Sequence, residues 1–258
     1  MNKALDNASL FYAVLQSVKE FNDAEVKGVI QGQINPTDRE NCFLASYWRA
    51  VNNVDTLLEM KLANQYQAIS MLARNLIELA VEARLIDAIP DAVPKMLMIT
   101  QLEKLRAARR IVAYESSHTL ASPLDTTVYK TFIATKETWI ETEAKRLWPA
   151  RKLSDVTHWS EKSLDGRVKI LGQPLEEMYE LYYRMLSWQV HSGGTGVMGL
   201  PKETFTHICA HGYWLGALAF EEIILAVVKE FRLSLAVESI LKKLNLAKYA
   251  PLITLEEK

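Results

Sequence analysis

Hydrophobic residues recur every three to four positions along most of the chain, which is the spacing of amphipathic α-helices. The eight prolines fall between these periodic segments or in their first turns, where the missing N–H removes no helical hydrogen bond. Runs that alternate hydrophobic and polar residues, as strands do, are nearly absent. The pattern predicts helices over residues 2–21, 37–62, 65–89, 91–115, 125–148, 174–192, 202–233 and 234–244.

Two of these helices carry a recognisable start signal. Thr37 is followed three residues later by Glu40, the spacing of a capping box, and Asp125 is suited to cap the helix that reaches Trp148. The stretch 151–172 breaks the pattern and predicts a loop or short helical turns, either at a domain boundary or as a surface connection. We therefore predict an all-α multi-helix bundle of seven or eight helices in a single domain, 1–258, with a minor boundary near 150–172 as the alternative.

Composition and charge agree with a globular chain. Of 258 residues, 49% are hydrophobic and 24% charged, and the net charge of −1 gives no global field for a polyanion, although local basic patches remain possible. Two cysteines, Cys42 and Cys209, are too few for a four-cysteine zinc site or a secreted disulfide scaffold. The beginning of the sequence lacks a signal-peptide pattern, so we expect a cytoplasmic protein.

The segment from Ile208 to Val228 is apolar enough to cross a bilayer. His211, Glu221 and Glu222 lie inside it, and burying charges in lipid costs several kcal/mol. We expect a core helix at the centre of the bundle rather than contact with a membrane.

The helix over 174–192 carries the sharpest chemical signal. Glu177, Glu180, Arg184, Ser187 and His191 stand at offsets of 0, 3, 7, 10 and 14, which at 100° per residue share one narrow helical face. Four of the ten glycines follow within residues 193–199, so His191 is expected in the last turn, where the helix dipole favours imidazolium. Arg184 and His191 are thus candidates to hold a phosphate and donate a proton, with Ser187 binding the phosphate or fixing the imidazole tautomer. The alternative is a solvated polar face.

Two further groups of residues accompany this helix. Glu78 follows Arg74 by one turn, so it either forms a simple ion pair with Arg74 or reaches Arg184 or His191 and orients it. The loop sequence from His158 to Ser163 adds Trp159 as a packing anchor or a base-stacking platform. The same loop contains two hydroxyl groups and one ammonium group, from Ser160, Ser163 and Lys162. These side chains either help to form the turn or contact a phosphate.

The string from Tyr182 to His191, together with Arg74–Glu78 and His158–Ser163, resembles the signature of an uncharacterised bacterial all-helical family, one of the domain-of-unknown-function families. The resemblance spans about residues 70–195. Arg184 and His191 are separated by six residues. More distantly, this spacing resembles the Arg-x6-His motif of the HEPN superfamily, which includes helical ribonucleases, toxins and antiviral effectors. That resemblance implies a metal-independent ribonuclease or toxin that binds RNA through Arg184, transfers a proton through His191, and builds a composite site as a homodimer.

Other features leave alternatives open. Two basic runs either offer a surface for an RNA backbone or are simply solvated. They are Lys104, Arg106, Arg109 and Arg110, and Lys145, Arg146, Arg151 and Lys152.

The chain contains no phosphate-binding glycine loop of the known kinds. Besides a ribonuclease, two function classes remain. One is a non-catalytic helical module that binds a partner protein or nucleotide. The other is a metal enzyme using side chains among Glu78, His118, His191, His207 and His211. The metal enzyme is the weakest because no Glu-x-x-His pair lies within the bounds of a single predicted helix. We expect no metal and no cofactor.

Overall fold

The computed structural model describes residues 3–60, 65–117, 125–190 and 202–233, with the isolated positions 242 and 245. Every regular element in this part of the chain is helical, which confirms the predicted all-α fold. The chain divides into two compact units, residues 1–88 with 164–258 and residues 89–163, and each is considered by itself.

The larger unit is a helical bundle. Two of its helices contain a π-helical segment: α1, η1 and α2 run on without a break, as do α8, η4 and α9. The bounds of the elements are α1 Lys3–Phe21, η1 Asn22–Val26, α2 Lys27–Gln31, α3 Asp38–Glu59, α4 Tyr66–Ala88, α7 Leu164–Leu171, α8 Leu175–Glu177, η4 Met178–Tyr183, α9 Arg184–Val190 and α11 Lys202–Glu230.

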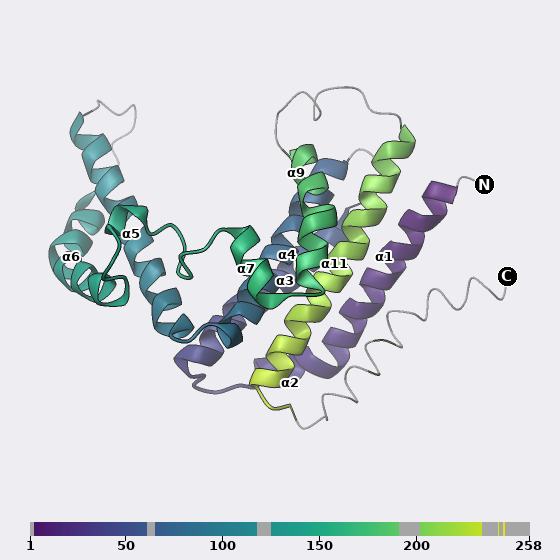
Figure 1. The fold of residues 1–258 in the computed structure, drawn as a ribbon, viewed down its shortest axis with the longest axis horizontal. Coiled ribbons are helices and arrows are strands. Elements are labelled where there is room, and N and C mark those ends of the chain that lie inside the picture. The colour runs from purple at the N-terminus through teal and green to yellow at the C-terminus, as the bar shows by residue number, and fades with distance from the viewer. Residues whose placement is uncertain are drawn as a thin grey trace. The chain divides into compact units, whose positions relative to one another are not determined.

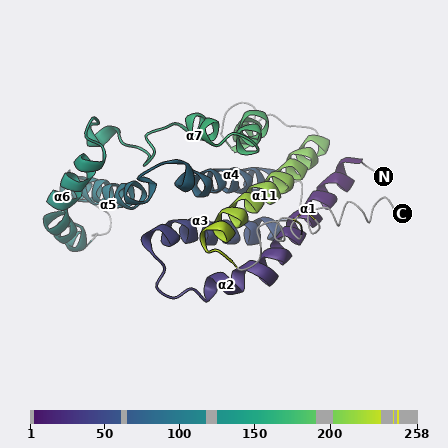
Figure 2. The same cartoon turned by 60° about the horizontal axis from the view of Figure 1, so that its bottom comes forward.

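Helix α11 is central to this bundle, since it packs against α1, α3 and α4 (Figures 1 and 2). Phe220 and Ile224 on α11 have no exposed surface, whereas Leu218 is half-buried. Thr204–Glu230 is long and apolar enough to span a membrane by composition, but most of its apolar window is buried within the protein. These contacts agree with the core position expected from the sequence.

Two glycines allow α11 to approach its neighbours closely. A Cβ atom at Gly212 would lie 2.5 Å from Cγ2 of Ile69 on α4, and one at Gly216 would lie 2.9 Å from Cδ2 of Leu57 on α3. Both distances are too short for carbon atoms, so a larger residue at either position would require the facing side chain to shift.

The predicted helix starts have the expected chemistry. The Thr37 side chain accepts from the backbone N–H of Glu40, and the Glu40 carboxylate accepts from the backbone N–H of Thr37, so the capping box is confirmed. Asp125 also acts as predicted, although it lies one position before the N-cap residue, because its carboxylate accepts from the N–H of Thr127. Helix α3 ends at Glu59, three residues earlier than predicted, and the helix predicted over 234–244 lies outside the described residues.

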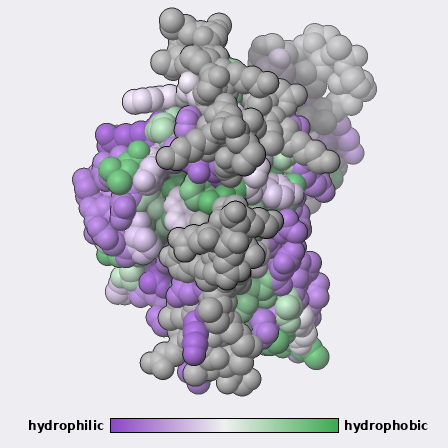
Figure 3. All heavy atoms as spheres, turned by 90° about the vertical axis from the view of Figure 1, so that its right-hand side faces the viewer, coloured by the Kyte–Doolittle hydropathy of each residue, from purple (hydrophilic) through white to green (hydrophobic). Residues whose placement is uncertain are grey.

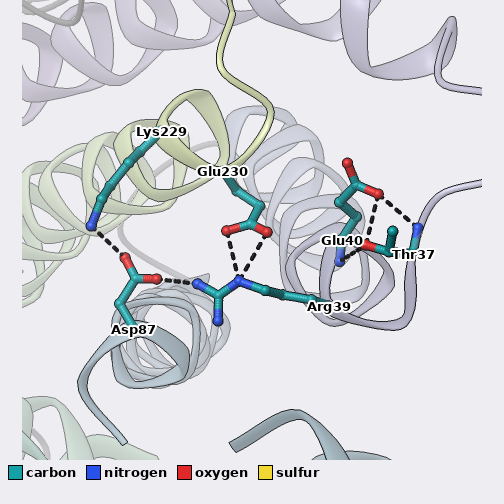
Figure 4. Close-up of polar contacts among 6 residues, drawn as sticks. All are labelled: Thr37, Arg39, Glu40, Asp87, Lys229 and Glu230. Atoms are coloured by element: carbon teal, nitrogen blue, oxygen red, sulfur yellow. Dashed lines mark hydrogen bonds and ion pairs between the residues drawn. The ribbon is translucent and has the colours of Figure 1, made fainter. Parts of the chain in front are cut away.

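A charged network joins the ends of three helices (Figure 4). Arg39, in the first turn of α3, donates to Glu230 at the end of α11 at 2.9 and 3.0 Å, and it also donates to Asp87 in the last turn of α4. The second Asp87 oxygen accepts from Lys229 at 2.8 Å. Burial by itself would raise the pKa of Asp87, but the hydrogen bonds and charges of Lys229 and Arg39 outweigh it and lower that pKa.

The hydropathy of the outer surface is that expected of helices that each bury one side. On the face drawn in Figure 3, the described side chains are hydrophilic over most of their area, with smaller hydrophobic areas between them. Amphipathic helices give this distribution because their polar stripes stay in water.

The smaller unit is a helical hairpin of α5 (Ala92–Ser117) and α6 (Thr127–Leu147), followed by a 3₁₀ turn, η3 (Leu153–Asp155). Arg106 on α5 donates to the carbonyl oxygens of Leu153 and Val156 and so ties the following loop to the hairpin. The unit ends at Ser163, within the stretch named as a possible boundary, and it begins at Ile89, where the sequence suggested none. The single-domain organisation stays a prediction, since compactness does not test independent folding.

Candidate functional site

The segment that carries Arg184 and Ser187 packs along α4. Leu175, Met178 and Leu186 are its buried residues and hold it there. Because Met178–Tyr183 form a π-helical turn, the uniform step of 100° per residue fails between Glu177 and Arg184. The predicted five-residue face is therefore interrupted by this turn: Arg184 and Ser187 lie on the regular helix α9, and Glu180 on the π-helical turn still lies 3.9 Å from Arg184.

Arg184 presents its guanidinium group to solvent. Its side chain is 60% exposed, and the ion pair that it forms within the described residues, with Glu180 on the preceding turn, is long at 3.9 Å. The guanidinium carbon lies 5.8 Å from the centre of the Tyr179 ring, within the range of a cation–π contact. Nearby, a hydrogen bond from Lys169 is the main cause that lowers the pKa of Asp165, and the charge of Arg184 lowers it further.

The structure describes Ser187 but not His191. The Ser187 hydroxyl donates to the carbonyl oxygen of Tyr183 at 2.8 Å, so its proton is engaged within its own helix while its oxygen can still accept. His191 lies outside the described residues, as does His118. The part of the predicted site that the structure describes is therefore Arg184 with Ser187.

Arg74 and Glu78 both form a hydrogen bond with the hydroxyl group of Tyr183, a residue that the sequence analysis did not single out. The Tyr183 hydroxyl accepts from the Arg74 guanidinium at 2.9 Å and donates to Oε1 of Glu78 at 2.5 Å. Arg74 and Glu78 themselves are 3.8 Å apart, and the guanidinium carbon lies 4.8 Å from the Tyr183 ring centre. The i, i+4 pair is thus present, and the partner of Glu78 on the other helix is Tyr183, the chain neighbour of Arg184, rather than Arg184 itself.

The Tyr183 hydroxyl stays protonated at neutral pH. Burial is the main cause that raises its pKa, and the hydrogen bond to Glu78 raises it further, against the opposing effect of Arg74. A neutral phenol that accepts from a cation and donates to an anion links α4 to the π-helical turn. The signal that could have found this residue is its place directly before Arg184, but the π-helical turn that aims it at α4 leaves no pattern in the spacing.

The loop residues belong to the other unit, 89–163. Trp159 is buried, as expected of a packing anchor. His158 Nδ1 lies 2.7 Å from the Ser160 hydroxyl oxygen, which in turn accepts from the backbone N–H of Lys162 at 3.4 Å. These bonds favour the turn-forming role of Ser160. Lys162 and Ser163 are exposed beside a cavity of about 310 Å³.

His211 of α11 has one ring nitrogen engaged within its own helix. His211 Nδ1 lies 2.8 Å from the carbonyl oxygen of His207, which fixes its ring against its own helix, and the Tyr182 ring lies 5.8 Å away. Within the described ranges, no group of three or more His, Cys, Asp or Glu side chains is placed to hold a metal ion.

Comparison with known proteins gives a family but no activity. No curated protein and no solved structure matches the chain. A family model matches residues 41–200, which is more than half of the chain and includes Arg74, Glu78, the 158–163 loop and Arg184. The chain therefore belongs to the family of unknown function DUF5677.

Proposed function

We propose that this protein is a metal-independent endoribonuclease of the HEPN-like kind, acting as a toxin or antiviral effector in the cytoplasm. The observation that carries the proposal is the exposed guanidinium of Arg184, which among the described residues is held by one long ion pair and which lies seven positions before His191 in the sequence. A planar guanidinium can bind two phosphate oxygens at once, which an ammonium group cannot do.

The chemistry needs no metal because RNA carries its own nucleophile. The ribose 2′-oxygen bonds to phosphorus while the bond from phosphorus to the 5′-oxygen breaks, giving a 2′,3′-cyclic phosphate and a 5′-hydroxyl end. The 2′-hydroxyl proton passes to water, and His191 donates a proton to the leaving 5′-oxygen. Arg184 stabilises the charge that develops on the phosphate, and Ser187 contributes its oxygen lone pairs to orienting the imidazole.

Tyr183 supports this site as a positioning residue. Its bonds to Arg74 and Glu78 fix the turn immediately before Arg184, so that the guanidinium starts from a defined backbone position. Glu78 then contributes through Tyr183 rather than through a direct contact with Arg184.

The test is an RNA cleavage assay with excess EDTA. Activity should persist in the chelator, and the products should end in 2′,3′-cyclic phosphate. Arg184→Lys and His191→Ala should each lower the rate about 100-fold or more, the usual scale for removing such a group. Lys136→Gln, which removes a positive charge from an exposed position of α6 in the other unit, serves as the control and should leave the rate unchanged. Cleavage that stops with EDTA, or that survives both substitutions, would overturn the proposal.

A second candidate is a non-catalytic module that binds a partner protein. The observation in its favour is that Leu181 and Trp188, on the same helical segment as Arg184, are 59% and 61% exposed. Exposed tryptophan beside arginine is typical of the centre of a protein interface. Absence of cleavage in the wild type, combined with loss of a partner on Trp188→Ser, would favour this alternative.

A further inference from the structure

A group of arginines on α5 lines a cavity in the smaller unit. Arg106, Arg109 and Arg110 occupy positions i, i+3 and i+4, which places them on one side of the helix. The cavity beside them measures about 360 Å³, which falls within the usual range for small-molecule sites. Leu102, Glu141 and Leu153 contribute to the remaining wall.

Two of the three arginines are held in place by the protein. Arg106 binds loop carbonyls, including that of Val156 at 2.9 Å. Arg109 donates to Glu137 at 2.8 Å and to Glu141 at 2.6 Å. These contacts fix two guanidinium groups of the basic run at the cavity wall.

Arg110 differs from its two neighbours. It is exposed, and among the residues that the structure describes no carboxylate forms an ion pair with it. Of the three guanidinium groups at the cavity wall, that of Arg106 pairs with Glu103 and that of Arg109 pairs with Glu137 and Glu141. Arg110 therefore supplies the positive charge that is left for an anionic ligand.

The charge of the whole smaller unit points the same way. Residues 89–163 hold twelve Lys and Arg against nine Asp and Glu, a net charge of +3. The rest of the chain holds 18 against 22, a net charge of −4. The near-zero charge of the complete protein thus conceals a basic unit, which raises the local concentration of anions around it.

We propose that this cavity binds a phosphate ester, with Arg110 and Arg109 contacting the phosphate oxygens and Leu102 and Leu153 packing against the organic part. Arginine suits this role because its fork of N–H donors matches two phosphate oxygens. The proposal does not rest on the ribonuclease activity, since it concerns binding by other residues in another unit.

Isothermal titration calorimetry of the full chain at low ionic strength tests the proposal with three probes: inorganic phosphate, AMP and a 2′-O-methylated RNA oligonucleotide. The methylated RNA cannot be cleaved through its 2′-oxygen, so binding is measured apart from any catalysis. Arg110→Gln should weaken binding about tenfold or more, as expected for hydrogen bonds to a charged group. Glu141→Gln should tighten it about threefold, because it removes the competing carboxylate.

Lys104→Gln is the matched control. It removes the same charge from an exposed position of α5 that does not line the cavity, so binding should change less than about twofold. Binding of phosphate and AMP that depends on Arg110 identifies a small phosphorylated ligand, and binding of the RNA alone with the same dependence identifies backbone phosphates. Absence of binding by all three probes, or equal losses in Arg110→Gln and Lys104→Gln, would overturn the proposal.

Discussion

The Tyr183 hydroxyl donates a hydrogen bond of 2.5 Å to Glu78, and this contact joins the π-helical turn of the candidate site to α4. Replacing Tyr183 with Phe removes this bond and the one from Arg74 but leaves the ring. We expect Tyr183→Phe to lower the free energy of unfolding by about 1 kcal/mol, because Arg74 and Glu78 can still pair with each other. Urea denaturation followed by circular dichroism measures the change.

Tyr179→Phe provides the comparison for that experiment. Its ring lies 5.2 Å from that of Tyr183, but its hydroxyl makes no hydrogen bond within the described residues. A change below about 0.5 kcal/mol is expected. Equal effects of the two substitutions would show that the Tyr183 hydroxyl contributes nothing specific.

Acid stability should depend on Asp87. Because the pKa of Asp87 is lower in the folded protein than in the unfolded chain, its contribution to stability is complete above the unfolded value near 3.8. The contribution is lost as the pH falls through the lower, folded value. Asp87→Asn should therefore cost about 1–2 kcal/mol at pH 7 and much less near pH 2.

Asp165→Asn is a surface comparison for this prediction. It removes an exposed pair with Lys169 on the same helix, which should cost less than about 0.5 kcal/mol at pH 7. Urea titrations at the two pH values distinguish the variants. An Asp87→Asn variant with the same loss at both pH values would contradict the role given to the charged network.

Two glycine substitutions should change stability in opposite directions. Gly212→Ala places a Cβ atom 2.5 Å from the buried side chain of Ile69 and should cost about 1–3 kcal/mol. Gly28→Ala, in helix α2, meets no atom within 4 Å and should stabilise by about 0.5–1 kcal/mol. Thermal melting of both variants measures the difference, and a neutral Gly212→Ala would show that α11 and α4 are not closely packed.

The central position of α11 predicts a graded response to charge. Ile224→Asp should abolish soluble expression, since a buried unpaired carboxylate costs several kcal/mol. Leu218→Asp should be milder, because Leu218 is half-buried and its carboxylate can reach water. Expression yield and melting temperature check the order, and near-native melting of Ile224→Asp would rule out the central placement.

The proposed composite site requires a homodimer formed through the region around Arg184. Leu181 and Trp188 are exposed there, and a two-fold interface would cover them twice. We expect light scattering to give twice the chain mass of 29.3 kDa at micromolar concentration, with Trp188→Ser shifting the protein toward monomer. A wild type that stays monomeric would contradict the dimer and favour a non-catalytic module.

The fold was largely predictable because helix starts are encoded locally. Thr37 and Glu40 lie three residues apart in the sequence and form their capping box without help from distant residues. The long apolar run of α11 likewise indicated its burial. Compact units depend on contacts between distant segments, so nothing in the local pattern marked the boundary at Ile89.

The candidate site was predictable only in part. Residue type and spacing singled out Arg74, Glu78 and Arg184 as candidates, but the helical wheel assumed a regular helix. The π-helical turn at Met178–Tyr183 adds residues per turn and so changes the direction of every side chain before Arg184. Tyr183 gained its role from that turn, which hydrophobic periodicity over so short a segment does not reveal.

The charged network of Arg39, Asp87, Lys229 and Glu230 has a mechanical consequence for α4. Asp87 is two residues before Ile89, where the smaller unit begins, so the network stands at the end of α4 next to the connection. Local unfolding that starts in the connection must break the bonds of Asp87 to two cations before it reaches the apolar part of the helix. The network thereby protects the C-terminal end of the helix that bears Arg74 and Glu78 from fraying.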